Sequence, residues 1–404
     1  MSHDPSRVRV TGPLTSYATG FRGELESQGY RRNAVCDQLR VLAHVSRWLE
    51  EKDLGPADLT REISLEFLAT RRQTGYVLWC SEKGVEPLLT YLRRVGAAPA
   101  FAPPAPATAV EHLLEEFRSY LLDERGLAPG TVTVDVRVAR RFLERRPQDD
   151  LGLDAVSAAD IVNFVTEQCE RGSAANVTAG LRAFLRFCHV TGRTARPLAH
   201  AVAKVAAWRL AGLPKSVDAE TVRALLRSCD RRTTYGRRDF AVLMLLSRLG
   251  LRSGEVARLC LDDIDWRAGE LVVSGKGSTF ERLPLPADVG EAVAGWLRRG
   301  RPPCAARQVI TRIRAPHGAL SSAGVYAIVH AASVRAGVPH VHPHRLRHTV
   351  ATEMLRSGAS LSEIGQVLRH RSVLTTAIYA KVDRDGLRQL ASAWPCVTSG
   401  PVQL

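Results

Sequence analysis

Apolar residues recur at three- and four-residue spacing along most of the first 208 residues, without an alternating strand pattern. This periodicity predicts amphipathic helices, about four in residues 1–95 and about four in residues 107–208. Residues 96–108 lie between them and read GAAPAFAPPAPAT. Such a Pro/Ala-rich stretch cannot propagate a helix and predicts an extended linker. We therefore expect two helical units joined by this linker.

The pattern changes in residues 215–390, where Ser216 or Asp218 can cap a new helix. Two runs, 270–274 and 280–285, flank a glycine-containing turn and predict a β-hairpin. The expected fold is therefore mainly α, with a small antiparallel β-sheet (α+β) in this C-terminal unit and a tail at 391–404. The clearest helices are predicted at 218–229, 237–249, 344–357 and 361–368.

The two helical units also resemble each other. Matching residues are separated by a near-constant 93 to 97 positions. The matches include Phe21 with Phe117, Trp48 with Phe142, Phe67 with Phe164 and Tyr91 with Phe184. This register favours an internal repeat in which residues 1–95 duplicate residues 107–208. The alternative is that two unrelated small helical bundles can be aligned in this way.

The charge balance points to polyanions as partners, because 56 Lys and Arg face 41 Asp and Glu, a formal net charge of +15. Most of these cations are arginines, a bias that genome base composition also produces, so their positions must decide. The polar N-terminus and the short apolar runs, of which 240–246 is the longest, predict no signal peptide and no membrane span. Eight scattered cysteines without a C-x-x-C pair indicate reduced thiols in a cytoplasmic protein.

Four separated segments carry residues suited to chemistry, and the first two surround the predicted hairpin. Arg252 and Glu255 stand three residues apart at a helix start, where the carboxylate can hold the guanidinium in one rotamer. Lys276 lies between two glycines at the hairpin tip, where the backbone can approach a ligand closely. Each also has a structural interpretation, a surface ion pair for the first and a solvated turn residue for the second.

The other two segments belong to the C-terminal helices. His344 and Arg347 share one helical face, and His370 precedes Tyr379 by nine residues. Taken singly, these side chains are also compatible with helix-terminal or packing roles. A metal site is a further alternative, although the segment has neither an H-E-x-x-H glutamate nor any other carboxylate. The histidines it would involve are His340, His342, His344 and His348.

Together the four segments suit a phosphodiester substrate. Two arginines can hold the non-bridging oxygens through always-charged, bidentate donors. A tyrosine hydroxyl can form a phosphotyrosine, which conserves the energy of the broken ester for a later reversal. A histidine and a lysine can take up and supply the protons. Because cationic side chains replace a metal ion, we expect no metal, no ATP and no other cofactor.

These segments resemble the tyrosine recombinases, or phage integrase family. The resemblance rests on GLRSGEVARL, SGKGSTFERLPL, HPHRLRHTVATEML and VLRHRSVLTTAIYAKV. Residues 107–208 are more loosely similar to the family's helical core-binding domain, which binds DNA. The family's motif residues match, in order, Arg252, Lys276, His344, Arg347, His370 and the nucleophile Tyr379.

The resemblance implies a role for each residue. Tyr379 would attack the scissile phosphate and leave a 3′-phosphotyrosyl link and a free 5′-hydroxyl. Lys276 would protonate the leaving oxygen, and His344 would assist proton transfer. Glu255 would support Arg252. The phosphate oxygens would be bound by Arg252, Arg347 and His370. The implied partners are double-stranded DNA and further copies of the chain, as a tetrameric synapse, with accessory proteins as additional candidates.

The chain also departs from the family's usual pattern. Arg369 and Arg371 flank His370 where many relatives carry Gly before it and a small residue after it. We expect this loop to add phosphate contacts or to alter the local backbone. Residues 1–95 are not part of the minimal two-domain enzyme, and we expect an additional DNA clamp, or alternatively a protein-contact module. The tail is expected to dock on a neighbouring subunit or to pack within its own chain, through Leu387, Leu390 and Trp394.

The function these observations predict is site-specific DNA recombination by an integrase or transposase of a mobile element, in the cytoplasm and at the nucleoid. Two alternatives remain at this point. One has the same chemistry, as in a type IB topoisomerase-like or telomere-resolving strand transferase. The other is a DNA-binding architectural or regulatory protein that has kept the fold and lost the activity.

Overall fold

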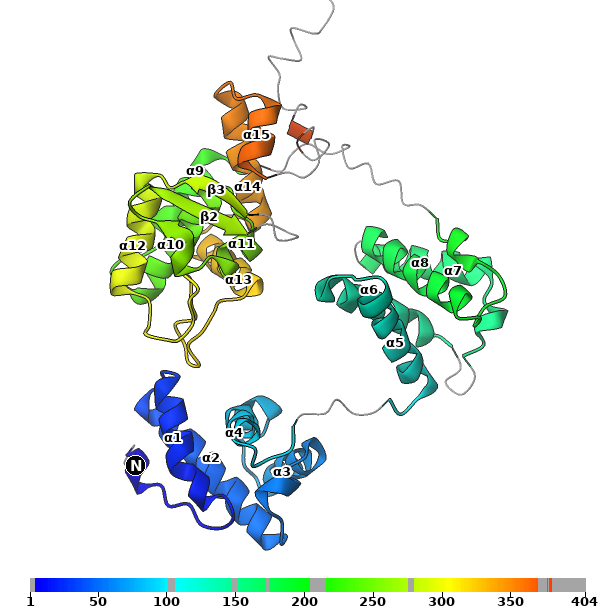
Figure 1. Cartoon of the computed structure of the whole chain (residues 1–404), viewed down its shortest axis with the longest axis vertical. Coiled ribbons are helices and arrows are strands. Elements are labelled where there is room, and N and C mark those ends of the chain that lie inside the picture. The colour runs from blue at the N-terminus through cyan, green and yellow to red at the C-terminus, as the bar shows by residue number, and fades with distance from the viewer. Residues whose placement is uncertain are drawn as a thin grey trace, which may run out of the picture. The chain divides into compact units, whose positions relative to one another are not determined.

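The structure is a computed structural model that describes residues 4–100, 106–146, 151–171, 174–203, 216–274 and 280–369, with Thr376, Ile378 and Tyr379 (Figure 1). The described residues are mostly helical and contain one three-stranded antiparallel sheet. The predicted α+β fold is therefore confirmed. Contacts group residues 102–209 into one compact unit and the remaining residues into a second. The domain boundaries given above remain a prediction.

The N-terminal bundle is built on helices with a clear apolar face. Its α3 begins at a cap, because the Thr60 side chain accepts a hydrogen bond from the Ile63 amide at 3.3 Å. Phe21, Leu42 and Leu68 are fully buried in its core. Its helices are α1 (Ala18–Ser27), α2 (Arg32–Glu51), α3 (Arg61–Gln73) and α4 (Glu82–Arg94).

The middle bundle follows the same plan. Pro129 begins its second helix at a position where the missing amide hydrogen costs nothing. Phe117, Phe164 and Phe184 are buried at its centre. Its helices are α5 (Ala109–Ser119), α6 (Pro129–Leu143), α7 (Ala158–Arg171) and α8 (Ala174–Val190).

The aromatic contacts of the two bundles correspond. The ring centroids of Phe21 and Tyr91 lie 5.3 Å apart, and those of Phe117 and Phe184 lie 5.2 Å apart. A second, edge-to-face contact joins helix two to helix three in each bundle. It is Trp48 with Phe67 at 5.6 Å in the first bundle and Phe142 with Phe164 at 5.2 Å in the second.

Smaller details also recur at the same spacing. A 3₁₀ turn precedes the third helix in both bundles, at Pro56–Asp58 and at Leu153–Ala155. A hydroxyl caps the helix that follows, from Thr60 in one bundle and from Ser157 in the other. A cation also covers the ring at the end of helix two, as Lys52 over Trp48 and Arg146 over Phe142. The bundles therefore share packing details as well as sequence register.

The C-terminal part is organised around α10 (Thr234–Arg248). Residues 241–246 are all buried, as expected of a helix that is apolar on every side. Helix α10 packs against α9 (Ala219–Arg227), α12 (Ala287–Arg299), α13 (Ser322–Ala336) and α14 (Pro343–Arg356). The four helices predicted here are confirmed as α9, α10, α14 and α15 (Leu361–Val367).

The sheet is formed by three strands that follow α10 in the sequence. Strands β2 (Glu270–Ser274) and β3 (Phe280–Pro284) form the predicted antiparallel hairpin, with Val272 opposite Arg282. The strand β1 (Ile264–Asp265) pairs with β2 and is too short for its sequence to show alternation. The hairpin tip at residues 275–279, which includes Lys276, lies outside the described residues.

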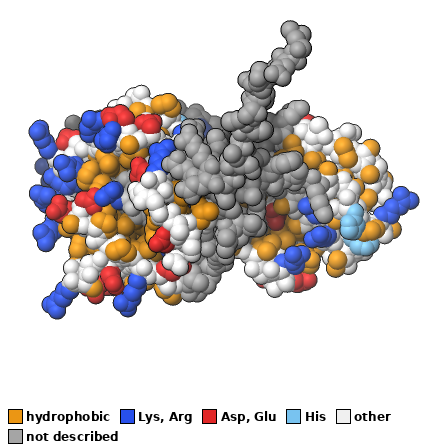
Figure 2. Space-filling model, turned by 90° about the horizontal axis from the view of Figure 1, so that it is seen from above, with side chains coloured by type: hydrophobic (Ala, Val, Ile, Leu, Met, Phe, Trp, Pro, Cys, Tyr) orange, Lys and Arg blue, Asp and Glu red, His pale blue; other side chains and the backbone are white. Residues whose placement is uncertain are grey.

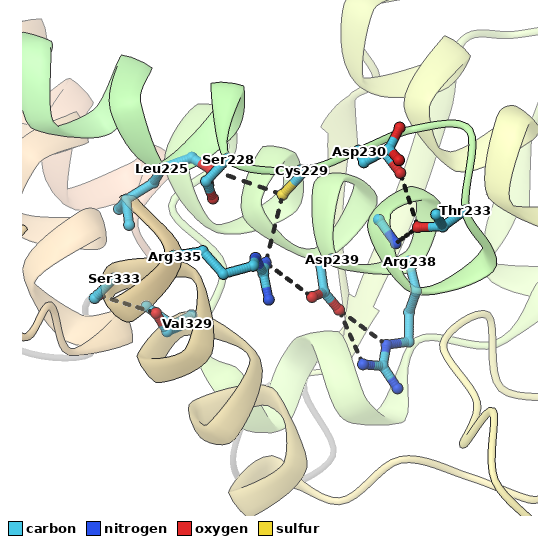
Figure 3. A network of polar contacts seen from close by, with 11 residues as sticks. Leu225, Ser228, Cys229, Asp230, Thr233, Arg238, Asp239, Val329, Ser333 and Arg335 are labelled. Atoms are coloured by element: carbon cyan, nitrogen blue, oxygen red, sulfur yellow. Dashed lines mark hydrogen bonds and ion pairs between the residues drawn. The ribbon is translucent and has the colours of Figure 1, made fainter. Parts of the chain in front are cut away.

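A buried ion-pair network ties α10 to α13 (Figure 3). The Asp239 side chain is 4% exposed and lies between two guanidinium groups. Its Oδ1 accepts from Arg238 Nη2 at 2.9 Å, and its Oδ2 accepts from Arg335 Nη2 at 3.0 Å. Because the two arginines come from different helices, this carboxylate fixes the position of α13 against the central helix.

The surface charge is mixed. In the described part of the face shown in Figure 2, basic side chains alternate with acidic and apolar ones and form no single continuous basic area. No helix among the described residues is both long enough and apolar enough to cross a membrane.

Candidate active site

The first part of the site is the turn between α10 and α11 (Ser253–Arg258). Gly250 has a φ of 58°, which lets the chain turn sharply after α10. Arg252 is then the N-cap residue of α11, in an extended conformation. Glu255 Oε2 accepts from the Arg252 backbone amide at 2.8 Å, and its Oε1 accepts from Arg252 Nη1 at 2.5 Å. The predicted pairing is confirmed, and one carboxylate fixes both ends of Arg252.

Arg369 is a second partner of the same carboxylate. Its Nη2 lies 2.9 Å from Glu255 Oε2, and the two side chains are 3% and 2% exposed. Burial alone would raise the pKa of Glu255, but Arg369 and Arg252 outweigh that effect and lower it below its usual value. Glu255 is therefore ionised at neutral pH and joins two cations that are far apart in the chain.

Arg369 stands where many relatives of the family carry glycine, and its backbone has a conformation that glycine favours. Its φ is 56°, in the left-handed region that glycine adopts without strain and that costs other residues about 1–2 kcal/mol. Its carbonyl accepts from Arg252 Nη2 at 3.2 Å. The guanidinium of Arg369 is buried and ion-paired with Glu255, so this residue does not present the expected phosphate contact. The expected change in the local backbone stays a prediction. Arg371 lies outside the described residues.

Arg347 occupies the inner side of α14 and is 5% exposed. Its Nη1 donates to the Gly250 carbonyl at 2.5 Å, and its Nη2 donates to the Leu368 carbonyl. Burial and the nearby Arg252 and Arg369 lower its pKa, but a guanidinium stays protonated near neutral pH. Arg347 thus connects the turn after α10 to the end of α15.

His344 lies one helical turn before His348 on α14, at the solvent-accessible end of this cluster. Partial desolvation, followed by the charges of Arg347 and Arg252, lowers the pKa of its imidazole. The ring is therefore neutral at pH 7. The charges of Arg347 and Arg252 place it close to two arginines, and its role in proton transfer stays a prediction.

Tyr379 is 1% exposed and packs with Val350, Ile364 and Leu368. Its hydroxyl lies 2.7 Å from His348 Nδ1. Burial raises the pKa of the phenol to about 12, although the nearby Arg347 opposes this shift. The phenol is therefore protonated at neutral pH and hydrogen-bonded to an imidazole.

His348 is the functional candidate that sequence reasoning missed. It entered only as part of the metal alternative, together with His340 and His342. In the structure those two rings make an edge-to-face contact, with centroids 4.4 Å apart, and lie beside Tyr326. No three His, Cys, Asp or Glu residues of the described ranges are placed to hold a metal ion. The spacing of four residues from His344 was the available signal, because it puts both histidines on one face.

The structure brings together five of the seven residues selected from the sequence. The charges of Arg252 and Glu255 act on Arg347, the charge of Arg347 acts on Tyr379, and those of Arg347 and Arg252 act on His344. Glu255 pairs with Arg252 and Arg369, and its charge also acts on Arg347, so three guanidinium groups lie near one carboxylate. This excess of positive charge suits a phosphate. Lys276 and His370 lie outside the described residues, so their placement stays a prediction.

The comparisons with known proteins point the same way. Residues 215–385 match the model of the phage integrase family. The integrase/recombinase y4rA of Sinorhizobium fredii is 41% identical over 392 residues, which cover 95% of each chain. This chain belongs to the phage integrase family. The tyrosine recombinase XerD of Mycobacterium tuberculosis is 33% identical over 307 residues, 70% of this chain and 97% of its own. As a tyrosine recombinase, the chain is a DNA breaking and rejoining enzyme.

Solved structures show the same fold at lower identity. Lambda integrase (75–356), as a dimer bound to a COC′ core site, has a TM-score of 0.53 at 17% identity, covering 68% of this chain and 95% of its own. The XerH recombinase in its post-cleavage complex has a TM-score of 0.52 at 17% identity, covering 87% of this chain and 95% of its own. The tyrosine recombinase fold therefore extends well beyond the strands and helices that carry the site.

Proposed function

We propose that this tyrosine recombinase is the integrase or transposase of a mobile element and that it cleaves DNA through a 3′-phosphotyrosyl intermediate on Tyr379. The observation that carries the proposal is the position of the Tyr379 hydroxyl, hydrogen-bonded to His348 within the cluster that holds Arg347 and Arg252. Further support comes from the name of its relative y4rA and from the fold it shares with the Tn1549 transposon integrase, at a TM-score of 0.52.

The chemistry begins with attack of the Tyr379 oxygen on phosphorus. Arg252 and Arg347 stabilise the charge that grows on the non-bridging oxygens, a task for which fixed cations in a desolvated site are well suited. The bond from phosphorus to the 5′ oxygen then breaks, and that oxygen takes a proton, for which Lys276 is the proposed donor. The phosphotyrosine keeps the ester's energy, so a 5′-hydroxyl from another strand can reverse the step.

Double-stranded DNA and other copies of the chain are the proposed partners. Lambda integrase has been solved as a dimer on a core site and as a tetramer on a Holliday junction, and the shared fold supports a similar assembly here. His370 is proposed to complete the phosphate contacts. The proposed site of action is the cytoplasm, at the nucleoid, with accessory proteins as further candidates.

The middle bundle is the proposed core-binding domain, and residues 1–95 are proposed to be its repeat and a second DNA contact. The shared aromatic contacts, 3₁₀ turns and helix caps support the repeat. The exposed Arg47 and Arg141 also lie at corresponding places, near the ends of α2 and α6 and one residue before the matched Trp48 and Phe142. A protein-contact role for the first bundle is the competing proposal.

Salt dependence of DNA binding separates these two roles. If both bundles contact the backbone, Arg47→Ala and Arg141→Ala should each weaken binding and reduce the slope of log K against log salt by about one. Arg227→Ala is the matched control, because this exposed arginine pairs with Glu220 on α9. A slope unchanged by Arg47→Ala and reduced by Arg141→Ala would favour the protein-contact role.

Covalent capture tests the main proposal. The protein is mixed with sheared DNA from its own gene and flanks and denatured in detergent, and the ends of DNA that stays attached are sequenced. Wild-type adducts that disappear in Tyr379→Phe would support the mechanism and reveal the site. DNA binding without adducts, even on nicked substrates, would instead favour the regulatory alternative. Supercoil relaxation or hairpin ends without joining of two sites would favour the topoisomerase-like or telomere-resolving alternative.

A further inference from the structure

We propose that His348 is the general base that removes the proton from Tyr379. The proposal rests on the proposed function, because it assumes that Tyr379 is the nucleophile. His348 Nδ1 lies 2.7 Å from the Tyr379 hydroxyl, within the range of a strong hydrogen bond. The ring centroids are 5.7 Å apart, and the rings are tilted by 56°. No rearrangement is needed for a proton to pass between these two atoms.

The phenol needs a base in this site. With a pKa of about 12, only a fraction on the order of 10⁻⁴ to 10⁻⁵ of Tyr379 is ionised near neutral pH. The proton must therefore leave as the bond to phosphorus forms. The nearby Arg347 charge favours the phenolate, but a guanidinium cannot accept a proton. A neutral nitrogen next to the hydroxyl can.

His348 has the protonation state this role requires. Burial is the main cause that lowers the pKa of its imidazole, and His344 and Arg347 on the same helix lower it further. Tyr379 is the titratable group that faces it from the C-terminal segment. The ring is therefore neutral at pH 7. In the proposed role the phenol donates and Nδ1 accepts, which assigns the ring proton to Nε2.

The two histidines of α14 then have different tasks. The charges that act on His344 include Arg252, Arg347 and Glu255, which places it near the phosphate contacts. His348 lies four residues later on the same face and contacts the nucleophile itself. His344 was expected to assist proton transfer in general. The geometry assigns the phenolic proton to His348 and leaves His344 on the phosphate side.

The proton balance of the step is complete. The Tyr379 hydroxyl gives its proton to His348 Nδ1 as its oxygen bonds to phosphorus. The bond to the 5′ oxygen breaks, its electron pair stays on that oxygen, and a separate donor protonates it. In rejoining, the imidazolium returns the proton to the departing tyrosine oxygen. His348 is thus a base in cleavage and an acid in the reverse reaction.

The test uses the full-length protein and a nicked substrate built from the site that covalent capture identifies. In His348→Asn, the amide keeps a polar atom near the position of Nδ1 but cannot accept the proton. Adduct formation should fall 10²- to 10⁴-fold, the usual contribution of a general base. The wild-type rate should fall only at a pH below the ordinary pKa of histidine, because the lowered pKa of His348 keeps its ring neutral above that. The His348→Asn rate should instead keep rising with hydroxide concentration into the alkaline range.

A substrate with sulfur in place of the leaving 5′ oxygen separates a base from an acid. A thiolate leaves without a proton, so a variant that lacks the general acid, such as Lys276→Ala, should be rescued. His348→Asn should remain slow on the same substrate. Equal rescue of both variants would overturn the assignment of His348 as the base.

The remaining outcomes are also decisive. A His348→Asn rate within threefold of wild type, with an unchanged pH profile, would overturn the proposal. Two controls show whether a slow variant has merely lost its fold: the DNA affinity of each variant and a second variant, His348→Gln. Variants that bind DNA normally but still form adducts slowly support the assignment of His348 as the base. If wild type itself forms no adduct, or if Tyr379→Phe still does, the proposed function fails instead.

Discussion

Glu255 gives the sharpest prediction about what holds the active site together. Its carboxylate lies between Arg252 at 2.5 Å and Arg369 at 2.9 Å, and the Glu255 and Arg369 side chains are almost fully buried. Glu255→Gln removes the charge and keeps the shape. The change should leave two guanidinium groups close to each other and to Arg347, without the anion that compensates them.

The magnitude follows from burial. Breaking a buried ion pair by removing one partner costs about 3–5 kcal/mol. Arg252 is 37% exposed, so water compensates part of its charge, and the amide keeps one acceptor oxygen. We therefore expect a loss at the lower end, about 3 kcal/mol. For a domain of about 150–250 residues, a loss of about 3 kcal/mol corresponds to a fall in Tm of about 6–12 °C.

Urea unfolding, monitored by hydrogen exchange in peptides from α10 and α14, measures the loss of stability in the part of the chain that holds the site. Glu270→Gln is the matched control, because Glu270 is 41% exposed and lies 3.5 Å from Arg282 on the hairpin. Its cost should stay within about 0.5 kcal/mol. Adduct formation by Glu255→Gln should also fall by at least about tenfold, because Arg252 loses its fixed position.

A double-mutant cycle tests the reasoning itself. Arg369→Gly removes one of the two cations and places glycine at a φ of 56°, where it is unstrained. Added to Glu255→Gln, it should recover part of the lost stability, with a coupling energy of about 2 kcal/mol. If the two changes were additive to within about 0.5 kcal/mol, the ion pair would not be what stabilises this turn.

Three further predictions follow from other buried charges. Asp239→Ala leaves Arg238 and Arg335 without their shared acceptor and should cost about 2 kcal/mol in the same urea assay; a loss below about 0.5 kcal/mol would contradict the network in Figure 3. Burial raises the pKa of Asp135, so its stabilising contribution is greatest in acid and is lost as the pH rises through the raised pKa. Asp135→Asn, which resembles the buried amide of Gln38 in the first bundle, should thus stabilise the middle bundle more at pH 7 than at pH 4 in urea unfolding, and an equal effect at the two pH values would refute the argument. Arg347→Lys cannot reach both the Gly250 and Leu368 carbonyls, so adduct formation should fall by about 10²-fold or more with little change in DNA affinity, whereas wild-type rates would show that charge alone suffices.

The sequence by itself determined the features that depend on near neighbours. Helical periodicity predicted α9, α10, α14 and α15, and alternation around a glycine-containing turn predicted the β2–β3 hairpin. It also predicted the pairing of Arg252 with Glu255, because residues three apart at a helix start share a face. These features follow from the local geometry of the backbone, which a short stretch of sequence specifies.

Tertiary structure alone decided the rest of the site. Glu255 and Arg369 are 114 residues apart, Arg347 and Gly250 are 97 apart, and His348 and Tyr379 are 31 apart. No periodicity links such positions, because their contacts depend on how α10, α14 and α15 pack. For the same reason the sequence shows His348 only as one member of a histidine-rich segment, whereas in the fold its Nδ1 lies 2.7 Å from the Tyr379 hydroxyl. The sequence identified which side chains can act on a phosphodiester, and the packing of distant helices determined which of them face one another.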